Sequence, residues 1–126
     1  MEKVKRPVYL NLFKIRLPIA GVVSLAQRAS GILMFLAMPF VVYLLDLSVQ
    51  SNQGFEQALS ILQHPFIVAV QILFVWALAH HLFAGIRFLL IDADIAIEKI
   101  PANRTAWLVM FLTIVVVVIA SLGMLL

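Results

Sequence analysis

The stretch FIVAVQILFVWALAHHLFAGIRFLLID, residues 66–92, decides the fold of this chain. No Asp, Glu, Lys or Arg occurs between Gln57 and Ile86, and an uncharged run of that length is typical of a helix that crosses a bilayer. Two histidines, His80 and His81, lie inside it. Ionisable side chains at membrane depth are costly, so they usually face a bundle interior, a cavity or a ligand. The stretch therefore indicates both a spanning helix and a candidate site on that helix.

The composition of the whole chain extends this interpretation. The 126 residues are 64% hydrophobic and 12% charged, with a mean hydropathy of +1.11. A soluble domain of this size could not bury so much apolar surface, so the sequence predicts an all-α integral membrane protein. The absence of cysteine excludes disulfides, zinc–thiolate sites, iron–sulfur ligation and covalent c-type haem attachment by this chain. The net charge of +3 does not indicate a nucleic-acid partner, because the basic residues cluster near the ends of apolar runs.

The chain is predicted to form a single domain, residues 1–126, with three membrane-spanning helices. We expect an arm at residues 1–20 and spans at about residues 22–46, 65–91 and 105–126. Pro39 should kink the first span, and Pro65 is well placed to begin the second. Between these spans, FEQALSIL at residues 55–62 could form a short amphipathic helix at the interface. Residues 92–104 read as a charged loop that Pro101 interrupts.

The distribution of Lys and Arg predicts the orientation in the membrane. Six of the nine lie at or before Arg28, the other three flank the second loop, and the first loop has none. By the positive-inside rule, the N-terminus and second loop are expected to be cytoplasmic, and the first loop and C-terminus outside. The basic arm precedes an apolar stretch too long for a signal peptide, so we expect the arm to be retained.

The two histidines point in different directions. Adjacent helix positions project about 100° apart, so His80 and His81 cannot both ligate one metal from a straight helix. Neutral imidazole is a common metal ligand, also for haem iron. His81 shares its face with Ala77, Ala84 and Gly85, which leave room for a flat bulky group or a close helix. Alternatively, both histidines simply hydrogen-bond neighbouring helices. One histidine supplies one axial position, so a bis-histidine haem would need another chain.

A polar stripe with helical spacing opens the first span, formed by Ser24, Gln27, Arg28 and Gly31. Ser24 and Arg28 could hydrogen-bond the same ligand carbonyl or carboxylate, since Arg offers several donors in a fixed fork. Alternatively, Arg28 snorkels to the interface and Ser24 packs against backbone. Arg87 and Asp92 at the end of the second span either pair with charges, those of ligand carboxylates or of protein groups, or anchor the helix end.

Three segments together resemble a known family. They are RPVYLNL (residues 6–12), LPIAGVVSLAQRASGILMF (17–35) and HHLFAGIRFLLID (80–92). They are similar to the cytochrome b membrane-anchor subunit of succinate dehydrogenase (respiratory complex II), which carries R-P-x-x-L, S-x-x-x-R-x-[ST]-G and H-x-x-x-G-I-R motifs in this order. The resemblance covers nearly the whole chain. It implies a bacterial inner-membrane subunit of succinate:quinone oxidoreductase that is not itself the catalytic head.

The resemblance also implies partners and cofactors. The expected partners are a flavoprotein subunit, an iron–sulfur subunit, a second small membrane anchor, the lipid membrane and a quinone, either ubiquinone or menaquinone. His81 matches the family's axial ligand of haem b, and the second axial histidine is expected from the other anchor. Ser24 and Arg28 match the pair that lines the quinone pocket, and Asp92 matches an acidic residue near it. Arg28 is also expected to reach a haem propionate.

Two positions depart from the family pattern. Many relatives have histidine where this chain has Gln27 and Phe88, both near the haem propionates. Gln27 can still donate a hydrogen bond to a propionate, whereas Phe88 cannot.

Three other functions stay open from the sequence alone. The chain could be a fumarate reductase anchor, a structural anchor without cofactor, or a small transporter that uses its histidines as proton sites. The transporter is disfavoured because the sequence has no membrane-embedded Asp or Glu and no inverted repeat.

Overall fold

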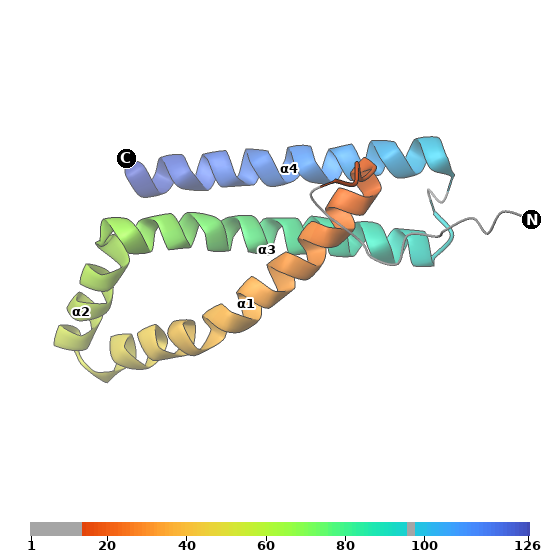
Figure 1. Ribbon diagram of the computed structural model, residues 1–126. Helices are drawn as coiled ribbons and strands as arrows, with labels where there is room; N and C mark the ends of the chain where they lie inside the picture. Colours follow the sequence, from red (N-terminus) through yellow and green to blue (C-terminus); the bar gives the residue numbers. More distant parts are fainter. Residues whose placement is uncertain (1–13, 96–97) are drawn as a thin grey trace, which may run out of the picture.

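The computed structural model of the chain describes residues 14–95 and 98–126, and all regular structure in these residues is helical (Figure 1). The helices are α1 (Ile19–Gln50), α2 (Asn52–Gln63), α3 (Pro65–Asp92) and α4 (Lys99–Leu125). Within the described part, α1, α3 and α4 are long and apolar enough to cross a membrane. The predicted all-α fold with three spans is therefore confirmed. The motif at residues 6–12 lies outside the described residues.

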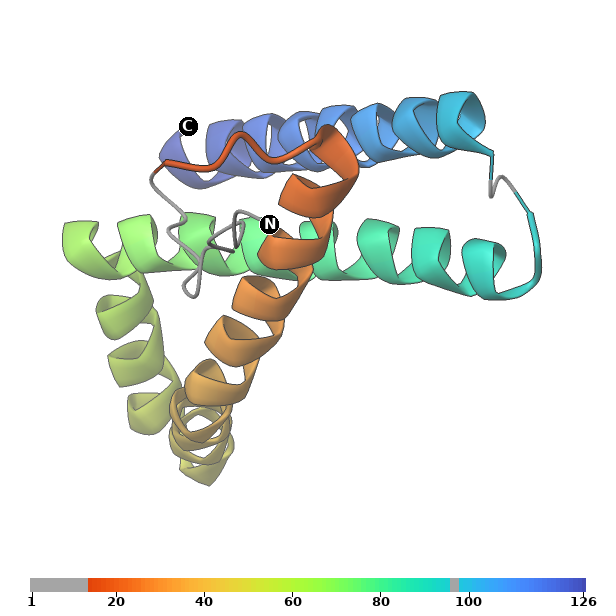
Figure 2. The same cartoon turned by 45° about the vertical axis from the view of Figure 1, so that its right-hand side comes forward.

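Helix α3 is the centre of the arrangement, because it packs against both α1 and α4. Helices α3 and α4 run side by side along their lengths, whereas α1 crosses α3 obliquely and then diverges from it (Figures 1 and 2). The short helix α2 closes the gap between the far end of α1 and the start of α3. Where the three long helices meet, a small core forms from Val23, Ala84, Ala106 and Val109.

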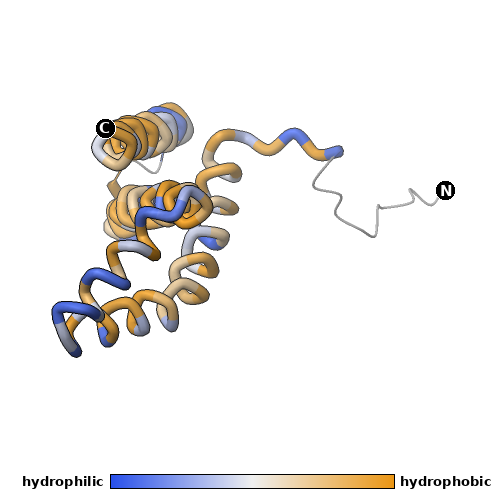
Figure 3. Tube along the Cα trace, turned by 90° about the vertical axis from the view of Figure 1, so that its left-hand side faces the viewer, coloured by the Kyte–Doolittle hydropathy of each residue, from blue (hydrophilic) through white to orange (hydrophobic). Residues whose placement is uncertain are grey.

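Most large apolar side chains of the spans face outward. Phe35, Leu89 and Phe111 are all more than half exposed, and hydrophobic residues cover α1, α3 and α4 along their lengths (Figure 3). Hydrophilic residues gather instead on α2 and near the helix ends. Lipid chains are as apolar as leucine, so helices in a bilayer can present such side chains to their surroundings. The outward apolar surface therefore fits a membrane bundle.

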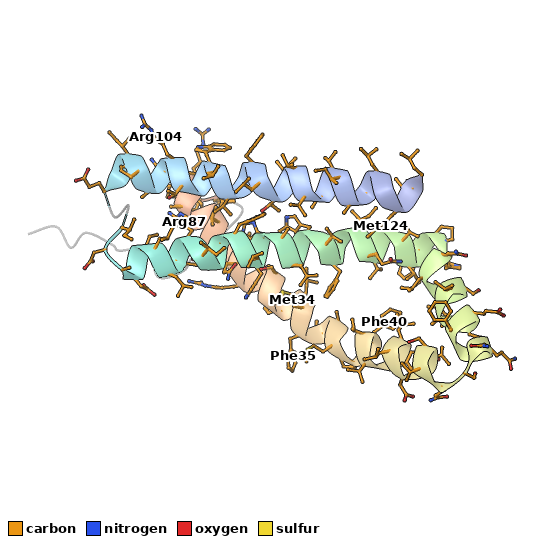
Figure 4. All side chains as sticks on the ribbon, turned by 180° about the vertical axis from the view of Figure 1, so that it is seen from behind. Met34, Phe35, Phe40, Arg87, Arg104 and Met124 are labelled. Carbon is orange, nitrogen blue, oxygen red and sulfur yellow. The ribbon has the colours of Figure 1, made fainter. Side chains whose placement is uncertain are left out.

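Helix α1 is longer than the predicted span at both ends. It begins directly after Pro18, continues to Gln50 and includes Pro39. A proline inside a helix removes one backbone hydrogen bond and clashes with the preceding turn, which bends the helix. The ribbon bends in the region of Phe35 and Phe40 (Figure 4), as the sequence predicts for Pro39.

Helix α4 also begins earlier than predicted, at Lys99 instead of residue 105. Pro101 lies in its first turn, where backbone N–H groups have no partner inside the helix, so the missing donor of proline costs nothing there. The prediction of a loop over residues 92–104, interrupted by Pro101, is therefore wrong. The connection that remains between α3 and α4 runs only from residue 93 to residue 98.

The α1–α2–α3 corner is fixed by caps and by one close backbone contact. Ser51 Oγ accepts the N–H of Gly54 at 3.0 Å, and His64 Nδ1 accepts the N–H of Phe66 at 3.3 Å. Gly54 is buried, and a Cβ atom there would overlap the carbonyl oxygen of Leu47. Helix α2 contains the predicted amphipathic segment 55–62 and extends beyond it at both ends. This corner positions α1 relative to α3.

Replacing Gly54 should loosen this corner. We expect Gly54→Ala to lower the stability of the chain in its detergent-solubilised complex by about 1–3 kcal/mol, because backbone must move to admit the methyl group. Gly123→Ala is the matched control, since a Cβ there meets nothing within 4 Å. It should leave the melting temperature unchanged or raise it slightly, because alanine is the better helix former. Thermal unfolding followed by circular dichroism checks both, and equal melting temperatures would contradict this account of Gly54.

Candidate functional site

The candidate site lies where α1 crosses α3. Small residues let the two helices approach closely, as is usual in membranes, where packing rather than hydrophobic burial holds helices together. A Cβ atom at Gly31 would lie 3.3 Å from Cε1 of His81, and one at Gly85 would lie 3.7 Å from Nε2 of Gln27. At this crossing, Ser30 of α1 lies against His81, and the backbone carbonyl of Val23 lies against His80.

His81 lies with its ring edge on the backbone of α1 at Gly31. Its Nδ1 atom is 3.2 Å from Ser30 Oγ, and its Nε2 atom has no hydrogen-bond partner among the described residues. The side chain is half-buried and lines an open groove of about 520 Å³. The other residues that line this groove are all apolar: Met34, Val75, Leu78, Ala79, Leu82, Phe83 and Val116. His81 thus lies on an otherwise apolar wall, with one ring nitrogen that has no hydrogen-bond partner among the described residues.

His80 has the opposite environment, because it is completely buried. Its Nε2 atom lies 3.3 Å from the carbonyl oxygen of Val23, which can only accept, so Nε2 carries the hydrogen. Its Nδ1 atom is enclosed and has no partner among the described residues. The ring stacks on Trp76 with centroids 5.6 Å apart. His80 is therefore enclosed by protein, with one ring nitrogen already hydrogen-bonded to α1.

Gln27 lies inside the contact between α1 and α3. Its amide nitrogen packs beside Gly85, and its Oε1 atom is buried without a partner among the described residues. A buried acceptor with no donor is destabilising, so the position is one where a further donor would add stability. Gln27 thus lies one helical turn along the α1–α3 contact from His81, because it packs on Gly85, four residues after His81.

The predicted polar stripe on α1 divides into two faces in the structure. Gln27 and Gly31 face α3, whereas Ser24 is half-buried and Arg28 is exposed. Asp92 is exposed at the end of α3, and within the described ranges no ion pair joins it to Arg28. The structure of this chain alone thus does not assemble Ser24, Arg28 and Asp92 into one pocket. Any pocket that uses them needs walls from elsewhere.

Arg87 anchors the end of α3 to the start of α4. Its side chain is only 5% exposed, and it lies between these two helices (Figure 4). Its Nε donates to Thr105 Oγ1 at 3.2 Å and its Nη2 donates to the carbonyl oxygen of Ala102 at 3.1 Å. Of the two alternatives for Arg87, the contacts support helix anchoring.

Sequence reasoning did not single out Ser30 and Thr105, the two hydroxyl residues that contact His81 and Arg87. Ser30 is fully buried and also bonds the carbonyl oxygen of Gln27 at 2.8 Å. The available signal was its place in the S-x-x-x-R-x-[ST]-G motif, directly before the glycine that packs on the ring of His81. Its partner could be found only once the register of the helix crossing was known.

Comparisons with known proteins give a consistent result. The family model of the succinate dehydrogenase/fumarate reductase transmembrane subunit matches residues 2–120. The succinate dehydrogenase cytochrome b556 subunit of Coxiella burnetii is 34% identical over 119 residues, covering 93% of this chain and 94% of the relative. The subunit of the same name from Paracoccus denitrificans is 26% identical over 106 residues, covering 84% and 82%.

These matches confirm the predicted resemblance to the succinate dehydrogenase cytochrome b anchor. Together with the three apolar helices, the bacterial relatives place the chain in the inner membrane as a multi-pass protein. The roles of His81, Ser24, Arg28, Gln27 and Asp92 stay predictions.

The anchoring of α3 to α4 can be tested with Arg87→Met. Methionine cannot donate a hydrogen bond, so the variant removes the donors to Thr105 Oγ1 and to the carbonyl oxygen of Ala102 in a buried site. We therefore expect stability to fall by about 1–3 kcal/mol. Arg104→Met is the matched control, because Arg104 is exposed on the same end of α4. The melting temperature of the detergent-solubilised complex is the measurement. A similar decrease in both variants would show that the contacts of Arg87 contribute no particular stability.

Proposed function

The chain belongs to the succinate dehydrogenase/fumarate reductase transmembrane subunit family and is a membrane-anchor subunit of succinate dehydrogenase, and we propose that in this role it binds haem b and forms part of a quinone-reduction site. The single observation that carries the haem proposal is the position of His81. His81 lines an apolar groove, one of its ring nitrogens has no hydrogen-bond partner among the described residues, and the other is engaged by Ser30.

The residues around His81 fit a haem. A porphyrin face is apolar, and every other residue of the groove is apolar. Metal-ligating histidines usually engage their second ring nitrogen in a hydrogen bond, as Nδ1 of His81 does with Ser30. The names of the two relatives as cytochrome b556 subunits support the same cofactor. When bound, the haem would supply a one-electron redox centre beside the quinone site.

The second axial ligand is proposed to come from a second small anchor subunit. His80 is enclosed, and His64 caps the opposite end of α3, about 25 Å from His81 at 1.5 Å per residue. The groove at His81 is not enclosed by this chain, so a neighbouring chain would complete it. Gln27 and Arg28 lie one turn along α1 from Ser30 and Gly31, and we assign them to the haem propionates.

The proposed quinone site lies beside Ser24 and Arg28, with Asp92 as a weaker member. Their spacing of four places Ser24 and Arg28 on one face of α1, and Arg28 is exposed and free to turn toward a ligand. Reduction of a quinone places negative charge on its carbonyl oxygens. A guanidinium and a hydroxyl held beside one oxygen stabilise that charge as it develops. The quinone itself, ubiquinone or menaquinone, depends on the partners.

We further propose that a flavoprotein and an iron–sulfur subunit dock at the cytoplasmic end, beside the basic arm and the start of α1. Succinate oxidation would take place in the flavoprotein. Electrons would reach the quinone through the iron–sulfur subunit. A fumarate reductase anchor would use the same residues with the overall direction reversed. A structural anchor without cofactor is the contrasting alternative, and it predicts a colourless purified complex.

The haem assignment is tested by two neighbouring substitutions. We expect His81→Ala to abolish the b-type signal in the reduced-minus-oxidised optical spectrum of the detergent-purified complex, because the iron loses an axial ligand. His80→Ala should retain the signal, since His80 is enclosed and bonded to Val23. If His80→Ala alone removes the signal, the ligand assignment is wrong, and a colourless wild-type complex would favour the structural anchor.

The quinone assignment is tested by Arg28→Ala. Removing the cation that stabilises the developing charge should lower kcat/KM for quinone about 10–100-fold in succinate:quinone reductase assays. Arg104→Ala is the control, because Arg104 is also exposed but lies on α4, outside the polar stripe. Succinate oxidation with an artificial electron acceptor should be the same in both variants. Equal quinone kinetics in both variants would exclude Arg28 from the site.

A further inference from the structure

We propose that Ser30 is a positioning residue for His81, fixing which ring nitrogen carries the hydrogen and therefore which nitrogen can ligate iron. This proposal rests on the proposed haem function. It concerns the contact between Ser30 and Nδ1 of His81. Ser30 belongs to α1 and His81 to α3, so the interaction forms only when these two helices pack.

The argument starts from the hydrogen count at Ser30 Oγ. A serine hydroxyl has one hydrogen and two acceptor lone pairs. Ser30 Oγ lies 2.8 Å from the carbonyl oxygen of Gln27, which has no hydrogen to give, so the hydroxyl hydrogen must lie between these two oxygens. The hydroxyl therefore has only lone pairs left for its second neighbour.

The second neighbour is Nδ1 of His81, 3.2 Å away. Because Ser30 can only accept in this direction, Nδ1 must carry the ring hydrogen and donate it. In a neutral imidazole the other nitrogen, Nε2, is then the unprotonated one. The structure thus assigns the free lone pair of His81 to the nitrogen that has no hydrogen-bond partner among the described residues.

Packing holds this arrangement in place. Ser30 is completely buried, so water does not compete for its lone pairs. The ring edge of His81 rests on Gly31, where a methyl group would lie only 3.3 Å from Cε1. Hydroxyl and glycine are adjacent on α1 and contact the same edge of the ring. Together they define both the tautomer and the rotation of the imidazole.

A bond from Nδ1–H to an acceptor also makes the imidazole a stronger electron donor to a metal, which favours the oxidised metal. Removing the acceptor should therefore raise the reduction midpoint potential of the bound haem. It should also weaken haem retention about 10-fold or more, the effect typical of partners that orient metal ligands.

The chain contains a matched control for Ser30. Ser48 also lies on α1 and makes the same type of bond to the carbonyl three residues earlier, Leu45, at the same distance of 2.8 Å. Ser48 lies near the opposite end of α1 from Ser30. Among the described residues, its side chain makes no hydrogen bond with a histidine. Ser48→Ala thus removes the local helix bond alone, whereas Ser30→Ala removes the local bond and the acceptor for His81.

The experiment compares Ser30→Ala, Ser30→Thr and Ser48→Ala in the intact purified complex. Redox titration of the b-type optical signal gives the midpoint potential, and electron paramagnetic resonance of the oxidised haem reports the ring orientation. We expect Ser30→Ala to raise the potential, shift the resonance and lose haem on washing. Ser48→Ala should match the wild type, and Ser30→Thr, which keeps a hydroxyl, should restore the wild-type potential.

The outcomes separate this inference from the haem assignment itself. If His81→Ala removes the b-type signal but Ser30→Ala has the same potential and resonance as Ser48→Ala, the positioning role of Ser30 is overturned and the ligand stands. If His81→Ala keeps its haem, the ligand assignment fails instead. A change in melting temperature alone, without a change in potential, would mean that Ser30 is only a packing residue and would also overturn the proposal.

Discussion

The close approach of α1 to α3 is the constraint on which the rest of this structure depends. In a bilayer, lipid gives helices no hydrophobic reason to associate, so contact has to come from tight packing and from hydrogen bonds. Gly31 and Gly85 provide the tight packing, and Ser30 and Val23 provide acceptors for the two histidines. Without this crossing, His81 would face acyl chains, and Nδ1 of His81 and Nε2 of His80 would both lack partners.

The sequence predicts the kind and order of the spanning helices well, because long uncharged runs leave few alternatives to a membrane helix. It predicts their ends less well. Charge suggested that the third span begins at residue 105, but a helix can extend into polar residues, and Pro101 is compatible with a first turn. Likewise, nothing between Pro18 and Ser51 stops α1, so it extends beyond its apolar core in both directions. The predicted orientation across the membrane depends on charge alone and stays a prediction.

The candidate site was predictable to the level of single helices only. Helical spacing distinguished His81 from His80, and the structure gives the two rings different environments: one opens on a groove and the other is enclosed. The stripe of Ser24, Gln27, Arg28 and Gly31 was expected to act as one surface, yet it divides between the helix contact and the exposed face. Spacing along one helix cannot reveal which residues a second helix will cover. For the same reason, the contact between Ser30 and His81, 51 positions apart, needed the structure.

The bond between Ser30 and its own Gln27 has a consequence for how this protein is made. Because α1 precedes α3 in the chain, the ribosome delivers α1 to the membrane before α3 exists. During that interval the hydroxyl of Ser30 would have no hydrogen-bond acceptor in the bilayer unless its own helix provided one. The carbonyl oxygen of Gln27 accepts its hydrogen. The bond within α1 thus satisfies the serine hydrogen without any contribution from α3, and it leaves the lone pairs of the serine for His81.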